Sequence, residues 1–263
     1  MAINHPFISP YSLSCLTSNQ VNEHLQHTPY LLLPLGGMEP FGMIGSFGVN
    51  SICIDAISGA LSQRLKLLVA PVLFYGCTSP YKSFKGSIGI KPKTFSSFLA
   101  NLCNDCFFQG FEKVIILNSI EENVLALELL LKRYNNHKVK IETFSIQSDA
   151  LIRNFVRGRK PGVEMGRSEF MMLSIAAFLN PALVIPAKDE RPIHFPASKV
   201  YTTWKKRGRD PEKYRKLFPT GSSSEIASQY DPVFGEEVFN FIVDSLLNKY
   251  SPLSINKNIN ASS

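Results

Sequence analysis

The chain has 263 residues, of which 44% are hydrophobic and 19% charged, and it is therefore too apolar for an intrinsically disordered protein. Its net charge of +7 is compatible with nucleic-acid binding, but no recognisable nucleic-acid motif accompanies that charge, which argues against such a partner. No apolar run approaches the roughly 20 residues that span a bilayer, and the first residues do not form a signal peptide, so we expect a cytoplasmic protein that does not enter a membrane.

Short apolar runs alternate along the chain with segments of helical periodicity. The first strand is expected at 30–37, and a helix follows at 51–65 after the cap pair Asn50–Ser51. The same alternation predicts strands and helices in this order: strand 66–74, helix 94–110, strand 113–118, helix 122–136, strand 138–146, and helices 168–179 and 235–250. Strands that are each followed by a helix predict an α/β fold, a three-layer α/β/α sandwich around a mainly parallel sheet. We expect a single domain over 1–250 and a flexible tail over 251–263.

The cysteines are odd in number and lie in apolar surroundings, which predicts reduced, mostly buried thiols: Cys15, Cys53, Cys77, Cys103 and Cys106. Cys103 and Cys106 form a C-x-x-C pair within the helix expected at 94–110. Because no second pair accompanies it, helix packing is favoured over a metal or redox role.

Sites in a parallel sheet lie beyond the carboxyl ends of its strands, which directs attention to "PLGGMEPFG" (34–42) and "ILNSIEEN" (116–123). These stretches and their spacing resemble the creatininase family of amidohydrolases, which carries P-x-G-x-x-E-x-H-G after its first strand, T-D a few residues later, and N-G-H-x-x-N after a central strand. The matching positions are Pro34, Gly36, Glu39, Gly42, Asn118, Glu122 and Asn123. Segments 73–88, 164–173 and 218–247 also resemble family segments, so the likeness runs from about 30 to 247.

The resemblance implies a binuclear zinc or manganese site built from Glu, His, Asp, His and Glu. At those positions this chain has Glu39, Phe41, Asn50, Ile120 and Glu122. Only the two glutamates are anionic, and two divalent ions held close together require several carboxylate or imidazole ligands. We therefore expect no metal and no other cofactor. A site rebuilt around His194 is a disfavoured alternative.

Four glutamates are the candidate catalytic residues: Glu39, Glu122, Glu164 and Glu169. Glu39 and Glu122 cap helix N-termini or pair with arginine in one reading, and act as a carboxylate pair in which one pKa is raised in the other. Glu164 stands where the family has a later histidine, and Glu169 is either a helix cap or an acid.

Candidate substrate contacts are Asn50, Phe41, Tyr81, Trp204, Arg207 and Arg209. The last three lie in the basic stretch 199–216, which is either a lid that binds a carboxylate or phosphate or a solvated surface loop.

Two functions remain open. The first is amidohydrolase-like C–N bond or acid/base chemistry on a small anionic substrate without the usual metals. The second is a catalytically inactive creatininase-fold pseudoenzyme that binds a ligand or a partner subunit. The resemblance also implies a homo-oligomer, a hexamer in many relatives.

Overall fold

Four parallel strands form the central sheet of the computed structural model, which describes residues 9–134, 140–161, 168–185, 198–223 and 229–255. In sheet order they are β2 (Leu68–Val69), β1 (Tyr30–Leu35), β3 (Lys113–Asn118) and β4 (Lys140–Ser145). Leu35 pairs with Asn118, and Asn118 pairs with Ser145, so the three longer strands end at the same edge.

The strand expected at 66–74 is shorter than predicted. Only Leu68–Val69 forms a ladder with β1, because Pro71 has no N–H to donate and interrupts the pairing. Pairing resumes at Leu73, whose N–H donates to the carbonyl of Pro34 over 3.0 Å.

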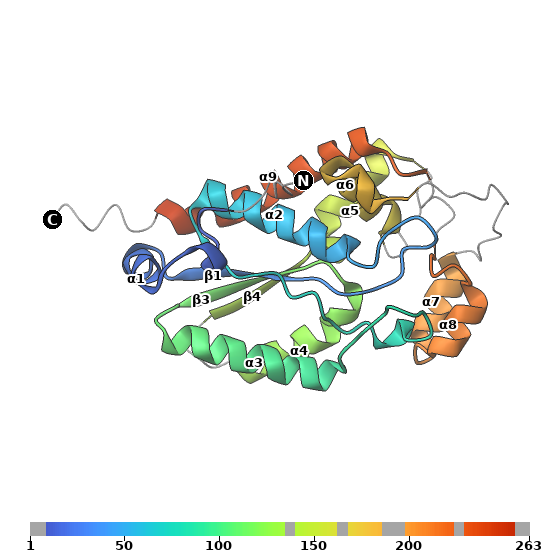
Figure 1. Cartoon of the computed structure of the whole chain (residues 1–263), viewed down its shortest axis with the longest axis horizontal. Coiled ribbons are helices and arrows are strands. Elements are labelled where there is room, and N and C mark those ends of the chain that lie inside the picture. The colour runs from blue at the N-terminus through green and yellow to red at the C-terminus, as the bar shows by residue number, and fades with distance from the viewer. Residues whose placement is uncertain (1–8, 135–139, 162–167, 186–197, 224–228, 256–263) are drawn as a thin grey trace.

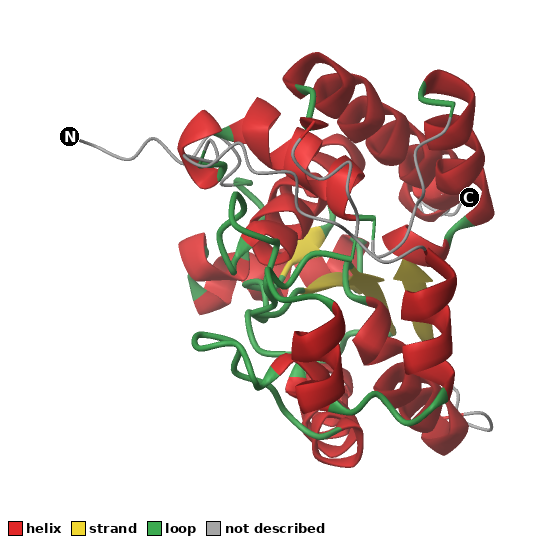
Figure 2. Ribbon diagram, turned by 90° about the vertical axis from the view of Figure 1, so that its right-hand side faces the viewer, coloured by secondary structure: helices red, strands yellow, loops and turns green. Residues whose placement is uncertain are grey.

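Helices cover both faces of the sheet (Figures 1 and 2), and the predicted three-layer α/β/α sandwich is confirmed. Ile115 and Leu117 of β3 belong to one apolar core, and Val114 and Ile116 belong to the other, as the alternation of side chains along a strand requires. The first core packs against α2 (Val49–Leu65), α5 (Ala150–Arg159), α6 (Glu169–Leu179) and α9 (Pro232–Ile255), and the second against α3 (Pro92–Phe108) and α4 (Val124–Tyr134).

Three further helices lie at the ends of the sheet: α1 (Ser18–His27) at one end, and α7 (Ser198–Lys206) and α8 (Pro211–Leu217) at the other (Figure 1). These three, and α5, were not predicted. The helix expected at 235–250 begins earlier than predicted, because Asp231 accepts the N–H groups of Val233 and Phe234 and caps α9. It also continues to Ile255, into the stretch expected to be a tail.

The predicted cap pair Asn50–Ser51 is wrong. Helix α2 begins at Val49 after Gly48, and both polar side chains are buried inside its first turn. Ser51 Oγ accepts the N–H of Gly37 over 2.9 Å, so these side chains bind the loop after β1 rather than their own helix.

No helix in the described ranges has the length and hydropathy to span a membrane. All five cysteines are free thiols.

Glu142 of β4 joins the far end of α9 to the sheet. Its carboxylate accepts hydrogen bonds from Lys113 (2.9 Å), Lys249 (3.0 Å) and Tyr250 (3.0 Å). Burial alone would raise the pKa of Glu142, but these three donors outweigh it and hold the pKa below its ordinary value. A carboxyl group with a depressed pKa stabilises the fold above its unfolded pKa, and that stability is lost as the pH falls through the folded pKa.

We expect Glu142→Gln to lower the free energy of unfolding by about 1–2 kcal/mol near neutral pH, because charged hydrogen bonds are lost. The difference from wild type should shrink as the pH falls to about 3, where the wild-type carboxyl is protonated too. Urea denaturation at neutral and at acidic pH measures this difference in the free energy of unfolding. Glu237→Gln is the control, since the Arg159–Glu237 pair is exposed and 3.8 Å apart; an equal effect of both variants would contradict the prediction.

Candidate functional site

Buried amides fix the corner at which β3 ends. Asn123 Oδ1 accepts the N–H of Cys77 over 2.8 Å, and its Nδ2 donates to Asn118 Oδ1 over 3.0 Å. Asn118 Nδ2 donates to the carbonyl of Ile120 over 2.7 Å. Both asparagines are at most 1% exposed, so this network sets the direction of the chain through Ile120 and Glu122.

Glu39 is buried in the loop that follows β1, with an exposure of 1%. Asn50, in the first turn of α2, donates its Nδ2 hydrogen bond to the Glu39 carboxylate. Asn50 therefore donates a hydrogen bond to Glu39, whereas an aspartate at this position would place a second carboxylate next to the first.

Two apolar side chains occupy the positions where the resemblance places metal-binding histidines. Phe41 is 1% exposed and belongs to the core formed with α2 and α6. Ile120 is fully buried and packs closely against Gly37: a Cβ added to Gly37 would lie 2.1 Å from Ile120 Cδ1. Met43, by contrast, is 57% exposed and does not help to fill this space.

The residues at the five family positions do not fit a binuclear metal site. In the part of the chain that the structure describes, no three His, Cys, Asp or Glu side chains converge in a way that could hold a metal ion. The two glutamates that could bind a cation accept hydrogen bonds from Asn50 and Tyr81.

Glu122 connects this corner to α7 and α8. Its carboxylate, 3% exposed, accepts the hydroxyl hydrogen bond of Tyr81. Tyr81 belongs to an aromatic cluster that we define by its buried members: Tyr81, Phe84, Tyr201, Trp204, Tyr214 and Phe218. The Tyr81 ring lies 5.0 Å from that of Tyr214 in an edge contact.

Trp204 lies inside the aromatic cluster with an exposure of 2%. Its Nε1 donates to the carbonyl of Asp210 over 2.7 Å, which fastens the turn between α7 and α8. Within that turn Arg209 has a left-handed backbone, with φ of 56°. Trp204 therefore holds the turn that presents Arg209, and its ring is packed against other aromatic rings.

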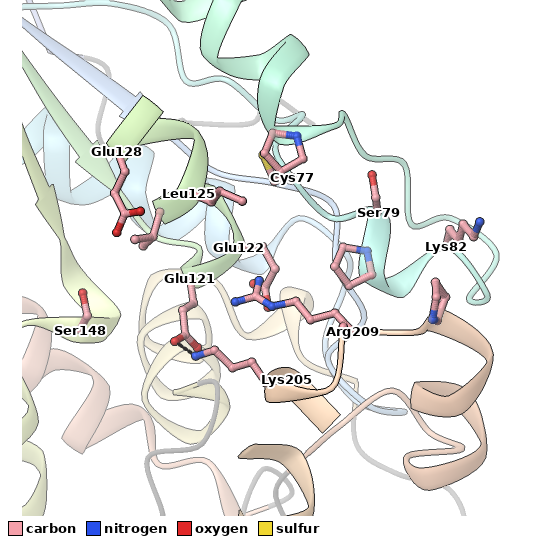
Figure 3. Close-up of a pocket in the computed structure, with 15 residues that line it drawn as sticks. Cys77, Ser79, Lys82, Glu121, Glu122, Leu125, Glu128, Ser148, Lys205 and Arg209 are labelled. Carbon is pink, nitrogen blue, oxygen red and sulfur yellow. Dashed lines mark hydrogen bonds and ion pairs between the residues drawn. The ribbon is translucent and has the colours of Figure 1, made fainter. Parts of the chain in front are cut away.

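A cavity of about 760 Å³ lies between this turn and the end of β3 (Figure 3). Among the residues that line it are Cys77, Ser79, Glu121, Glu122, Lys205 and Arg209. Lys205 of α7 forms an ion pair with Glu121 across the cavity, and the Arg209 side chain points toward Glu122 (Figure 3). Burial, and then the nearby Glu122 charge, raise the pKa of the Cys77 thiol to about 12, so this thiol is protonated at neutral pH.

Glu169 is the first residue of α6 and is 1% exposed. Its carboxylate accepts hydrogen bonds from the N–H of Ser223 (3.0 Å) and from Ser223 Oγ (2.9 Å), and thereby holds the chain after α8 against α6. Glu164 and His194 lie outside the described residues.

The structure thus brings Glu122 and Arg209 to one cavity and pairs Glu39 with Asn50. Arg207 is exposed and is not part of the cavity lining. Sequence reasoning missed Glu121 and Lys205. Both stood inside stretches already singled out, "NSIEEN" and the basic stretch 199–216, but only the tertiary structure brings them into contact.

A sequence model of the creatininase (creatinine amidohydrolase) family matches residues 14–250 of the chain. A 3-dehydro-scyllo-inosose hydrolase of Thermotoga maritima is 24% identical over 105 residues, which are 39% of this chain and only 33% of that protein. A crystal structure of creatinine amidohydrolase has a TM-score of 0.70 and 19% identity, covering 94% of this chain and 99% of the other. A putative creatinine amidohydrolase from Bacteroides fragilis gives a TM-score of 0.68 and 17% identity, covering 94% and 97%.

Proposed function

This chain belongs to the creatininase family, and on that premise we propose that it binds a small anionic molecule in the cavity beside Glu122 and carries out no metal-dependent hydrolysis. The observation that carries the proposal is the burial of Phe41 and Ile120 at the family's histidine positions, together with an open cavity that Glu122 lines. Apolar side chains cannot bind a metal ion, whereas the cavity remains large enough for a small ligand.

Cations at the cavity support an anionic ligand. Arg209 and Lys82 line the cavity, and neither side chain makes an ion pair within the described ranges of the chain. A guanidinium binds a carboxylate or a phosphate through two parallel hydrogen bonds. Arg209 is the better placed of the two, because it is half-buried while Lys82 is exposed.

We expect Arg209→Gln to weaken the binding of small carboxylates and phosphates at least about tenfold, because a charged hydrogen-bonding partner is lost. Arg207→Gln is the matched control: it removes the same charge two residues away, from an exposed side chain outside the cavity. Ligand-induced shifts in melting temperature, followed by calorimetry, measure both variants. Equal losses in the two would show that net charge, and not the cavity, attracts the anion.

Metal-free hydrolysis is a second candidate, favoured by the hydrogen bond between Tyr81 and Glu122 at the cavity wall. In this alternative Glu122 accepts a proton from water, and Tyr81 fixes the direction of its carboxylate. Glu39, whose carboxylate accepts a hydrogen bond from Asn50, would supply a second carboxyl group.

We expect protein purified without chelators to contain close to zero equivalents of zinc or manganese, and not to hydrolyse creatinine or related cyclic amides. Elemental analysis and an amide-hydrolysis assay on the same sample measure the two quantities. One equivalent of metal or more per chain would contradict the proposal. Turnover in metal-free protein that Tyr81→Phe abolishes, and that Tyr214→Phe (which loses a bond to the Gly221 carbonyl) preserves, would establish the second candidate.

Assembly into a homo-oligomer and residence in the cytoplasm are part of the same proposal. The family resemblance supports the first, and the five free thiols are compatible with the second.

A further inference from the structure

The net positive charge of the protein comes from two short segments of the chain. Residues 82–85 and 205–216 contain nine of the 28 lysines and arginines but only two of the 21 acidic residues. All other residues together carry equal numbers of basic and acidic side chains, so the net charge of +7 is that of these two segments. The second segment includes the end of α7 and all of α8, at the end of the molecule opposite α1 (Figure 1).

The two segments are far apart in the sequence but form one surface. Arg215 of α8 donates a hydrogen bond to the carbonyl of Ser83, and its guanidinium lies 5.0 Å from the centre of the Phe84 ring. Ser83 Oγ donates to Glu212 over 2.6 Å. We define the basic surface by six exposed cations that form no ion pair and no side-chain hydrogen bond with any residue in the described ranges: Lys82, Lys85, Lys206, Arg207, Lys213 and Lys216.

The basic surface offers charge without apolar contacts. The large apolar residues of the two segments, Phe84 and Tyr214, are buried. Interfaces between proteins take most of their binding energy from aromatic and apolar anchors and are depleted in lysine. Stable attachment to a membrane needs a lipid chain or an apolar side chain in addition to a basic patch. A surface of lysine and arginine alone therefore fits neither of these partners well.

We propose that the basic surface binds the phosphate backbone of a nucleic-acid duplex without regard to base sequence. Lysine and arginine neutralise phosphates and release the counterions bound to them. These contacts carry no sequence information, so they require no recognisable motif, and the proposal revises the expectation that rested on the missing motif. Single strands also stack their bases on exposed aromatic rings, and residues 82–85 and 205–216 expose none, which favours a duplex.

Two full-length variants with the same net charge test the position of the binding surface. The first removes three cations of the basic surface: Lys206→Gln, Lys213→Gln and Lys216→Gln. The control removes three exposed lysines that lie outside it: Lys66→Gln, Lys132→Gln and Lys140→Gln. Because Lys140 begins β4, it lies at the opposite edge of the sheet from α7 and α8. Unchanged melting temperatures show that both variants are folded.

Fluorescence anisotropy measures binding to DNA and RNA duplexes of about 20 base pairs, each in two unrelated sequences, between about 50 and 200 mM salt. Polyglutamate is the probe for an acidic protein partner, and phosphatidylserine vesicles are the probe for a membrane. We expect wild type to bind both sequences equally, with a dissociation constant of about 10 μM or below at the lowest salt. The logarithm of the affinity should fall with the logarithm of the salt concentration with a slope of about −3 or steeper.

The surface variant should bind the duplexes at least about tenfold more weakly, with a salt slope that is shallower by about 2, while the control retains the wild-type values. Equal losses in the two variants would overturn the proposal, because net charge and not this surface would then attract the duplex. Tighter binding of polyglutamate or of the vesicles than of any duplex would also overturn it, as would the absence of duplex binding at the lowest salt. The binding of small anions through Arg209 is a separate measurement, and its outcome does not depend on this one.

Discussion

Gly235→Ala is expected to lower the free energy of unfolding by about 3 kcal/mol, one of the largest single-residue effects in this protein. Gly235 lies in the first turns of α9, where that helix crosses α6. A Cβ at this position would lie 2.0 Å from the carbonyl oxygen of Ser174 and 2.4 Å from its carbonyl carbon. Because these atoms belong to the α6 backbone, the added methyl group can be accommodated only if the two helices move apart, which disrupts the larger core.

Gly158→Ala is the matched control. Gly158 also lies in a helix, α5, but nothing is within 4 Å of the position of its Cβ, and the residue is exposed. The same substitution should therefore stabilise the protein by about 0.5–1 kcal/mol, because alanine loses less conformational freedom on folding. Urea denaturation measures both variants, and a stabilising Gly235→Ala would disprove the close contact between α6 and α9.

Strands β1 and β3 could be predicted because they are continuous apolar runs. "KVIILN" was predicted with the bounds of β3 because no turn residue interrupts its apolar run, and five of its residues are buried in the structure. The helices α1 and α8 were missed because "SNQVNEHLQH" and "PEKYRKL" carry few apolar residues. Their capping signals were nevertheless present: Thr17 with Gln20 at the first, and Asp210 before Pro211 at the second.

The sequence singled out two stretches after strand ends as the candidate site, but the contacts within that site could not be read from the sequence. Glu39 and Glu122 were identified by motif, whereas their hydrogen-bonding partners, Asn50 and Tyr81, depend on how the elements pack. Trp204 was a candidate substrate contact because the resemblance places a pocket-covering segment at the basic stretch 199–216. Tyr201 and Trp204 are three residues apart, a spacing typical of one face of a helix that the sequence analysis did not use, and the structure shows that this face is buried.

Asn50→Asp supplies the carboxylate that the resemblance places at this position. The variant tests whether the residues at the five family positions can then bind a metal ion. The Asn50 side chain is fully buried and donates to Glu39, and an ionised aspartate has no proton to donate. We expect a loss of about 3 kcal/mol in the free energy of unfolding near neutral pH, because two carboxylates would share a buried space. Asn180→Asp, at an exposed cap whose Oδ1 accepts the N–H of Ala182, should stay within about 0.5 kcal/mol of wild type.

The pH dependence of the Asn50→Asp effect identifies its cause. Two carboxyl groups in contact have at least one pKa raised above its unfolded value, so the folded variant binds a proton that the unfolded chain releases. The stability difference from wild type should therefore shrink as the pH falls from 7 to about 5. Zinc or manganese should restore little of the loss, because Phe41 and Ile120 still occupy the histidine positions. If either ion instead restores the full stability at neutral pH, the carboxylates of Glu39 and of the Asn50→Asp variant suffice to bind a metal, and the proposed absence of a metal site would depend on this one residue.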